Sequence, residues 1–356
     1  MSLLSDSSAP YLDLPDLRVA LLDVKDCSAW DAFVIDCPQA SFFHLSGWKK
    51  IIEESFGHKT FFLYAKSGNT ILGVLPLAQI KSALFGHTLT SLPFCVYGGI
   101  ASQSAEATHK LDEAAQRLAL SLNVDYLEYR NLHPQHPEWK STDLYVTFRK
   151  ALDADVEKNM LEIPRKQRAM VRKGIKAGLV SELDDDIQRF FSVYSDSVHR
   201  LGTPVFAKKY FRLLREVFGD ACEVLTVRQK NRVIAGVLVF YFRDEVLPYY
   251  GGGTTEAREL AGFDFMYWEL MRRSVERGYK VFDYGRSKRG TGSFDFKKNW
   301  GFTPQPLYYE YQLYRGDSVP QHNPLNPKYR LFINAWRKLP LVVANWVGPH
   351  IVKNLG

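Results

Sequence analysis

Residues 283–302, "DYGRSKRGTGSFDFKKNWGF", gather the residue types that bind anions. The segment places five cations among aromatic residues and glycines: Arg286, Lys288, Arg289, Lys297 and Lys298. The glycines permit backbone shapes that side chains would block. Arg286 follows the strand-like run "KVFDYG", so its side chain can reach a cleft beyond the end of that strand. We expect this loop to bring cations to an anionic substrate.

A second basic cluster lies in "IPRKQRAMVRKGIKAG". Pro164 suits the first turn of a helix, and Arg165, Arg168 and Arg172 would then share one face. Guanidinium groups offer paired donors to phosphate oxygens, so this row predicts a pyrophosphate clamp. A solvated basic face is the alternative. Nucleic acid ranks below a nucleotide-linked or lipid-linked substrate, because the stretch has no aromatic residue on which bases could stack.

Two further segments carry candidate pocket residues. "SDSVHRLGTPVF" places His199 near a helix end that Gly202 terminates, and we keep His199 as a substrate-pocket candidate. Capping the last helical carbonyls is the alternative. "LPYYGGGTTEAREL", which contains Tyr250, brings three glycines to a helix start, where backbone N–H groups can approach an anion. Its spacing matches neither GxGxxG nor the P-loop, so the glycines could equally serve only to turn the chain.

Length and composition limit the classes of protein to which the chain can belong. The 356 residues suffice for two domains, and 46% hydrophobic with 24% charged residues indicates a globular chain. The net charge of +7 favours anionic partners. No apolar run reaches membrane-spanning length and the polar start lacks a signal pattern, so a cytosolic location is expected. The four cysteines are far apart, which predicts reduced thiols and no metal site.

The chain shows signs of an internal repeat. Each half has two adjoining strands, then a glycine-containing segment, a helix (about 104–122 and 263–277) and a strand ("DYLEYRN" and "VFDYGRS"). The offsets are 163 residues from Gly73 to Gly236, 153 from Gly98 to Gly251 and 155 from Glu128 to Asp283. Near-constant offsets predict two copies of one α/β unit, although chance agreement of common hairpins is the alternative.

We place the domains at 1–152 and 153–315, followed by a tail at 316–356. The tail begins with the proline-rich "SVPQHNPLNP", which is typical of a linker. Its remainder combines Trp336 and Trp346 with Arg337, Lys338 and Lys353 around a modest apolar segment. That mixture suits attachment to the inner face of the cell membrane, and packing onto its own domain is the alternative.

The chain resembles the FemAB-related proteins associated with exosortase and exopolysaccharide systems. The motifs, spread over about residues 40–310, are "FFHLSGWKKIIEESFGH", "LGVLPLAQIKSALFG", "LTSLPFCVYGGI", "IPRKQRAMVRKGIKAGL", "HRLGTPVF" and the loop at 283–302. The resemblance implies two tandem acyl-CoA N-acyltransferase (GNAT)-like domains with a central mixed sheet each, the second being BioF-like. It also implies transfer of an acyl or aminoacyl group to an amine of a cell-envelope or exopolysaccharide precursor.

The same resemblance bears on the donor. It implies acyl-CoA or another activated acyl donor as co-substrate, with no tightly bound cofactor. The chain lacks the long helical arm of some staphylococcal members that use aminoacyl-tRNA, which counts against a tRNA donor. A non-catalytic scaffold protein of a polysaccharide or exosortase system that retains the fold is the competing class.

The resemblance also assigns roles in the site. Lys297 best matches the family lysine that is implicated in catalysis, with Lys298 as the alternative. Acyl transfer builds negative charge on the carbonyl oxygen, and a cation among aromatic residues would stabilise it strongly. Asp283 would orient the amine or hold Arg286. Trp48 of "FFHLSGWKK" is placed among the substrate-binding residues.

Overall fold

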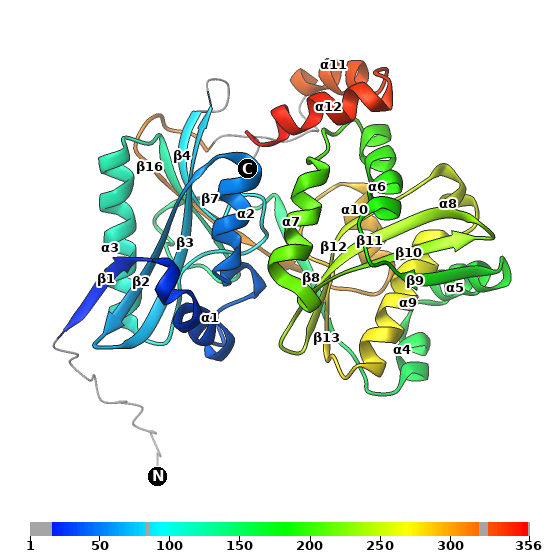
Figure 1. Cartoon of the computed structure of the whole chain (residues 1–356), viewed down its shortest axis with the longest axis horizontal. Coiled ribbons are helices and arrows are strands. Elements are labelled where there is room, and N and C mark those ends of the chain that lie inside the picture. The colour runs from blue at the N-terminus through cyan, green and yellow to red at the C-terminus, as the bar shows by residue number, and fades with distance from the viewer. Residues whose placement is uncertain (1–15, 83–85, 320–326, 355–356) are drawn as a thin grey trace, which may run out of the picture.

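The computed structural model describes residues 16–82, 86–319 and 327–354. The described chain forms two side-by-side α/β units, each built on one sheet, with a helical hairpin above them (Figure 1). None of the helices within the described ranges is long and apolar enough to cross a membrane.

The first sheet has eight strands in the order β1-β2-β3-β4-β6-β16-β7, with β5 paired to β3. Its strands are β1 (Leu17–Leu21), β2 (Lys59–Ser67), β3 (Thr70–Ser82), β4 (Gly86–Ser91), β5 (Ala101–Ser102), β6 (Tyr126–Asn131), β7 (Lys140–Thr142) and β16 (Tyr308–Leu313). β4 and β6 run parallel, whereas the other pairs of this sheet are antiparallel.

The second sheet also has eight strands, in the order β14-β8-β13-β12-β11-β10-β9, with β15 paired to β8. Its strands are β8 (Tyr145–Ala151), β9 (Leu179–Leu183), β10 (Cys222–Gln229), β11 (Arg232–Phe242), β12 (Glu245–Gly253), β13 (Val281–Asp283), β14 (Ser287–Lys288) and β15 (Pro304–Pro306). β12 and β13 form its parallel pair.

The two sheets share one strand order, which confirms the predicted fold class of two mixed α/β sheets. The path β1-β2-β3-β4-β6-β16 corresponds to β9-β10-β11-β12-β13-β8, and the parallel pair falls at the same step in both. Gly73 and Gly236 accordingly lie on the equivalent strands β3 and β11, and Glu128 and Asp283 are each the third residue of β6 and β13.

The equivalence is interrupted at one place. β12 runs unbroken to Gly253, but its counterpart in the first half is divided into β4 and β5 by the loop 92–100. Gly98 lies in that loop, whereas Gly251 lies within β12, so this landmark pair is not equivalently placed. The loop bends into the space between the halves.

The halves exchange one strand each. β8 comes from the end of the first half of the chain but pairs with β13 in the second sheet. β16 comes from the end of the second half but pairs with β6 in the first sheet, where its orange ribbon lies among blue and cyan strands (Figure 1). Each sheet therefore contains a strand from the other side of the predicted domain boundary at 152/153. The position of that boundary stays a prediction.

Helices cover the sheets. The first half has α1 (Cys27–Asp36), α2 (Gly47–Phe56) and α3 (Ala105–Leu122). The second half has α4 (Val156–Glu162), α5 (Arg165–Lys176), α6 (Gln188–Leu201), α7 (Lys208–Phe218), α8 (Thr255–Glu259), α9 (Gly262–Glu276) and α10 (Gly292–Asn299). Short 3₁₀ turns lie at Val24–Asp26, Phe42–His44 and Gly219–Ala221. The hairpin consists of α11 (Pro327–Trp336) and α12 (Leu341–Val352).

Local sequence signals explain where several helices begin and end. The Ser104 hydroxyl accepts a hydrogen bond from the Ala107 amide at the start of α3, and Asn123 ends that helix in a left-handed conformation (φ 55°). Gly202 ends α6 in the same way (φ 80°). The helices expected at 104–122 and 263–277 are therefore confirmed to within a residue as α3 and α9.

An apolar interface joins the halves. Phe42 of the first half stacks on Phe240 of β11, with ring centroids 4.4 Å apart. Trp48 of α2 lies 5.3 Å from the ring of Phe218 and has no exposed surface. This shared core holds the two sheets in one arrangement, and it thereby fixes the cavity between them.

Candidate functional site

A cavity of about 780 Å³ lies between the two sheets and is lined by residues of both. β12 and β13 pair only at Glu245–Val281 and Val246–Phe282. Beyond these pairs the strands separate, and residues 248–251 on one side and 284–286 on the other line the cavity. Divergence of two parallel strands thus opens the second sheet toward the first half.

Four cations line this cavity: Arg130, Arg286, Lys288 and Lys297. The Arg130 Nε donates to Glu128 Oε1 at 2.9 Å, so this cation is neutralised. Arg286 donates from Nη1 to the phenol oxygen of Tyr309 at 3.0 Å. Among the described residues, no carboxylate lies within ion-pair distance of Arg286. Two carboxylates, Glu128 and Asp143, also line the cavity, so cations outnumber carboxylates there and an anionic ligand would balance the excess charge.

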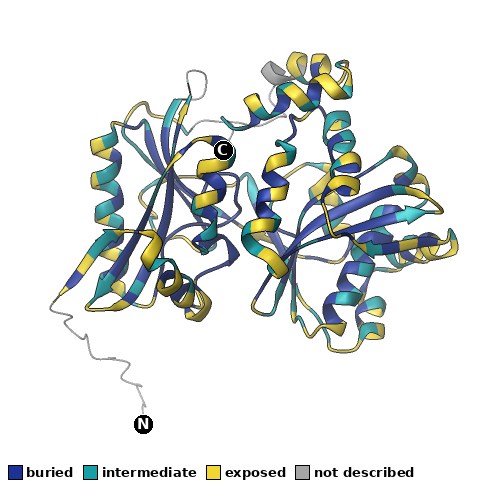
Figure 2. Cartoon of the chain, in the orientation of Figure 1, coloured by how far each residue is buried: buried dark blue, intermediate teal, exposed yellow. Residues whose placement is uncertain are grey.

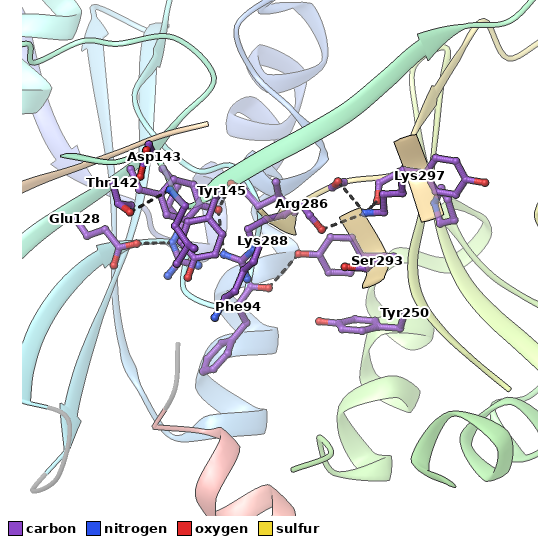
Figure 3. Close-up of a pocket in the computed structure, with 18 of the residues that line it drawn as sticks. Phe94, Glu128, Thr142, Asp143, Tyr145, Tyr250, Arg286, Lys288, Ser293 and Lys297 are labelled. Atoms are coloured by element: carbon purple, nitrogen blue, oxygen red, sulfur yellow. Dashed lines mark hydrogen bonds and ion pairs between the residues drawn. The ribbon is translucent and has the colours of Figure 1, made fainter. Parts of the chain in front are cut away.

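Aromatic side chains form much of the remaining wall. They are Phe94, Tyr126, Tyr145, Phe206, Tyr249, Tyr250, Tyr267, Tyr284, Tyr309 and Tyr311. The Arg286 guanidinium lies 4.9 Å from the ring centre of Tyr145 and 5.7 Å from that of Tyr309. Figure 3 shows Arg286 and Lys288 beside Tyr145, with Glu128 at one end of the group and Lys297 at the other. Rings of this kind hold the guanidinium in place while leaving its remaining N–H groups available.

Lys297 lies on α10 and turns back toward the end of β13. Its Nζ donates to the carbonyl oxygens of Tyr284 (2.7 Å), Gly285 (3.0 Å) and Arg286 (3.1 Å). Burial, opposed by Asp283 and reinforced by the Arg286 charge, lowers the pKa of Lys297 to about 7. Lys297 therefore fastens the loop that presents Arg286, and its charge responds to pH near neutrality.

The pKa of Lys288 is lowered for the same reasons as that of Lys297. Burial and the neighbouring Arg286 charge lower the pKa of Lys288 to about 8. Its Nζ lies 5.6 Å from the ring centre of Tyr145, on the side of the cavity that Arg286 also faces. A bound anion would raise both lysine pKa values, because an opposite charge favours the protonated form.

Asp283 is fully buried beneath the cavity rather than in its wall. Its carboxylate accepts hydrogen bonds from Arg149 Nη1 (2.9 Å), the Tyr97 hydroxyl (2.9 Å), Thr147 Oγ1 (3.2 Å) and the Gly285 amide (2.7 Å). The ion pair of Asp283 is thus with Arg149. Its contact with Gly285 anchors the first residue of the loop, and a catalytic role for Asp283 stays a prediction.

Tyr250 lines the cavity, as expected of a substrate-pocket residue, and its hydroxyl lies 2.9 Å from that of Tyr210. The glycines that follow it lie inside β12. A Cβ on Gly252 would come within 2.6 Å of the Tyr194 Cα, and one on Gly253 within 2.9 Å of Phe263. These glycines therefore allow α6 and α9 to pack closely against the strand.

The other predicted binding residues lie outside the cavity wall. The arginine row of α5, Arg165, Arg168 and Arg172, does not line it, and Arg168 donates from Nη1 to the Leu161 carbonyl at 3.1 Å. His199 contacts the Trp336 carbonyl through Nε2 at 3.1 Å, and Trp48 is buried between the halves. The structure brings together Tyr250, Arg286 and Lys297 among the predicted residues.

Sequence reasoning missed Arg130 and Tyr309. A usable signal existed, because the equivalent strands end in the similar runs "LEYRN" and "FDYGR", and the repeat already matched Glu128 with Asp283. Aligning those runs would have placed Arg130 near Arg286. Tyr309 had no such signal, because it arrives on the exchanged strand β16. Within the described ranges, no group of three or more His, Cys, Asp or Glu side chains could hold a metal ion.

Comparison with known proteins supports this fold. Residues 161–298 match the family described as acetyltransferase (GNAT) domain. No curated protein sequence matches the chain.

Several solved structures share the fold. The crystal structure of FemX is 14% identical, with a TM-score of 0.64 over 89% of this chain and 100% of that one. The C-terminal domain of a putative lysylphosphatidylglycerol synthetase from Agrobacterium fabrum is 13% identical, with a TM-score of 0.58 over 81% and 92%. A tandem GNAT protein from the clavulanic acid biosynthesis pathway is 13% identical, with a TM-score of 0.52 over 85% and 100%. Residues 161–298 thus match a GNAT domain, and the described chain has the tandem GNAT fold that the resemblance to FemAB-related proteins predicts.

Proposed function

We propose that this protein is an acyltransferase that moves an acyl or aminoacyl group to an amine on a phosphate-bearing acceptor. The observation that carries the proposal is the cavity between the two GNAT sheets, whose wall combines Arg130, Arg286, Lys288 and Lys297 with tyrosines. A phosphate or pyrophosphate would take the place of the carboxylate that Arg286 lacks, and the tyrosine rings would pack against apolar or sugar parts of the acceptor.

The reaction is attack of the acceptor amine on the donor carbonyl. A C–N bond forms, the bond from the carbonyl carbon to the leaving sulfur or oxygen breaks, and the amine loses a proton. Negative charge appears on the carbonyl oxygen, and Lys297 is the cation we assign to stabilise it. In the structure its ammonium is held by three carbonyl oxygens, so the oxyanion would have to displace one of these contacts.

The donor we propose is acyl-CoA or another activated acyl compound, used as co-substrate. The opening between β12 and β13 supports this assignment. Where the two strands no longer pair with each other, their backbone N–H and C=O groups can form hydrogen bonds with an extended donor that contains amide groups. This opening is continuous with the cationic part of the cavity. A donor lying there would bring its carbonyl toward Lys297.

For the acceptor we propose a nucleotide- or lipid-linked glycan precursor of the cell envelope or of an exopolysaccharide. The lysylphosphatidylglycerol synthetase domain supports this class, since its name refers to a phospholipid. The cationic cavity supports it independently. An exosortase-associated setting is part of the proposal on the strength of the sequence resemblance alone.

The test measures thioester consumption. Purified protein is incubated with acetyl-CoA and longer acyl-CoA compounds together with amines that do or do not carry a phosphate, and free thiol release is followed alongside mass spectrometry of the product. We expect turnover that requires the phosphate-bearing amine and is lost in Lys297→Ala. Tight binding of the acceptor without thiol release from any donor would instead assign the chain to the non-catalytic scaffold class.

A further inference from the structure

The helical hairpin α11–α12 packs on the second half of the protein and contacts the first half at its end. Ala344, Gly348 and Val352 form the buried row of α12. Gly348 fits against Val205, where a Cβ would come within 3.0 Å of the backbone. Asn345 Nδ2 also donates to the Ser195 hydroxyl of α6 at 3.4 Å. The tail therefore has a defined place on its own domain, as one of the two sequence interpretations expects.

α11 is held in a similar way. The Trp336 carbonyl contacts His199 Nε2 at 3.1 Å, and Arg337 Nη2 donates to the Leu201 carbonyl at 3.2 Å. Gly202 makes room for Ile333, since a Cβ at Gly202 would lie 2.5 Å from its side chain. These contacts orient both helices, so the side chains on the opposite side of the hairpin have a fixed outward direction.

That opposite side is apolar and exposed. Leu331 is 82% exposed, Val342 80% and Trp346 74%, and Phe332 and Val343 are each about 40% exposed (41% and 40%). Figure 2 shows exposed residues along the upper side of the hairpin, which lies at the edge of the molecule. A tryptophan exposed to this extent beside a leucine and valines is unusual on a protein surface that faces only water.

The charge of the tail is one-sided. From Ser318 to Gly356 the sequence has no Asp or Glu, and it has five cations: Lys328, Arg330, Arg337, Lys338 and Lys353. Arg337 and Lys338 are exposed at the end of α11, next to the apolar surface. Exposed tryptophan and aliphatic residues flanked only by cations complement a surface that is anionic outside and apolar beneath.

We propose that the outer side of α11–α12 (Leu331, Phe332, Val342, Val343 and Trp346) is a docking surface for an anionic lipid bilayer. The apolar side chains enter the boundary between headgroups and acyl chains, while Lys338 contacts lipid phosphates. The protein lies on the membrane without spanning it, because α12 has 12 residues and α11 has 10.

The docking surface is connected to the cavity through α12. Val352, at the end of the buried row, lines the cavity, and so does Val319 before the hairpin. The Lys353 carbonyl lies 2.7 Å from His58 Nε2 of the first half. Docking would therefore bring the cavity close to the bilayer, which gives a lipid-linked acceptor a short path. The docking itself does not depend on the proposed reaction.

The test is binding to vesicles of phosphatidylcholine with and without phosphatidylglycerol, measured by co-sedimentation of the full chain. We expect the protein to sediment with phosphatidylglycerol vesicles and to be released by salt. The double variant Val342→Ser, Trp346→Ser should bind about tenfold or more weakly, because two side chains lose their apolar environment. Its matched control, Val24→Ser with Leu120→Ser, removes similarly exposed apolar side chains elsewhere and should bind like the wild type.

A second pair of variants separates charge from apolar contact. Lys338→Glu should weaken binding at least about fivefold, whereas Lys230→Glu, which changes the net charge equally in the turn between β10 and β11, should have little effect. Thermal unfolding confirms that each variant is folded. Absence of wild-type binding to phosphatidylglycerol vesicles overturns the proposal, as does equal binding by the tail variants. A wild-type dimer in light scattering that Trp346→Ser dissociates would instead make this surface a contact between two copies.

Discussion

Arg130 and Arg286 come from equivalent strand ends of the two halves and converge on one ring, that of Tyr309. Their guanidinium carbons lie 5.3 Å and 5.7 Å from its centre. Only Arg130 has a carboxylate partner, Glu128, and each guanidinium repels the other. The duplicated fold thus places two like charges together and neutralises one of them. The remaining positive charge is the basis of the proposed anion binding.

Removing that charge should weaken acceptor binding. In Arg286→Met the donors to a phosphate are lost, and charged hydrogen bonds contribute about 1.5–3 kcal/mol each. We expect the KM for a phosphate-bearing acceptor to rise roughly tenfold to a hundredfold, measured in the thiol-release assay. Arg289→Met is the matched control, because the exposed Arg289 side chain donates only to the Asp143 carbonyl. An equal effect of both variants would argue against a specific role of Arg286.

Lys297→Ala should lower kcat by roughly a hundredfold, which is typical for loss of one group that stabilises an oxyanion. Lys298→Ala, which changes an exposed neighbour on the same helix, should do little. Circular dichroism checks that both variants fold. Full activity of Lys297→Ala would remove this residue from the catalytic mechanism.

The lowered pKa of Lys297 predicts that its contribution to the reaction rate depends on pH. With a pKa of about 7, Lys297 is charged below that pH and loses its proton as the pH rises through it. If the charge stabilises the oxyanion, the ratio of the wild-type kcat/KM, which reports the free enzyme, to that of Lys297→Met is highest below pH 7 and falls above it. Taking the ratio at each pH cancels the titration of the acceptor amine. A ratio that rises with pH would mean that the neutral amine of Lys297 accepts a proton.

Asp283→Ala should destabilise the protein as well as alter the site. The substitution removes the more deeply buried of the two carboxylates that pair with Arg149, whose other partner is Glu245, and loss of a hydrogen bond to a charged group costs about 1.5–3 kcal/mol. We expect urea denaturation to show a loss of this size. Asp185→Ala, at an exposed position, should change the free energy of unfolding by less than about 0.5 kcal/mol. An Asp283→Ala variant of normal stability but without activity would support a direct role in the reaction.

A phosphate contact at the arginine row of α5, outside the cavity, remains a prediction. Arg168→Ala with Arg172→Ala should raise KM more than it lowers kcat, because such a clamp holds ground and transition states alike. Lys166→Ala with Lys173→Ala removes the same charge from another side of the helix and serves as the control. Kinetics unchanged by the arginine pair would assign that row to a solvated helix face.

The sequence by itself determined the elements and their repetition. β10 and β11 are the two adjoining strands expected in the second half, and α3 begins after Ser104, because strand alternation and helix caps are signals carried by neighbouring residues. The order of these elements predicted two copies of one α/β unit, and the resemblance to FemAB-related proteins identified that unit as GNAT-like. Arg286 and Lys297 were found because cations and glycines cluster in one short loop.

Only the tertiary structure decided which polar and aromatic residues meet. Trp48 and Asp283 are residue types common in sites, yet the apolar contact between the halves buries the first and Arg149 of β8 pairs with the second. Tyr309 reaches the cavity because β16 crosses from one half of the chain to the sheet of the other. Burial and strand exchange depend on contacts between residues that are far apart in the chain. Local sequence patterns reflect only neighbouring residues, so they do not predict these contacts.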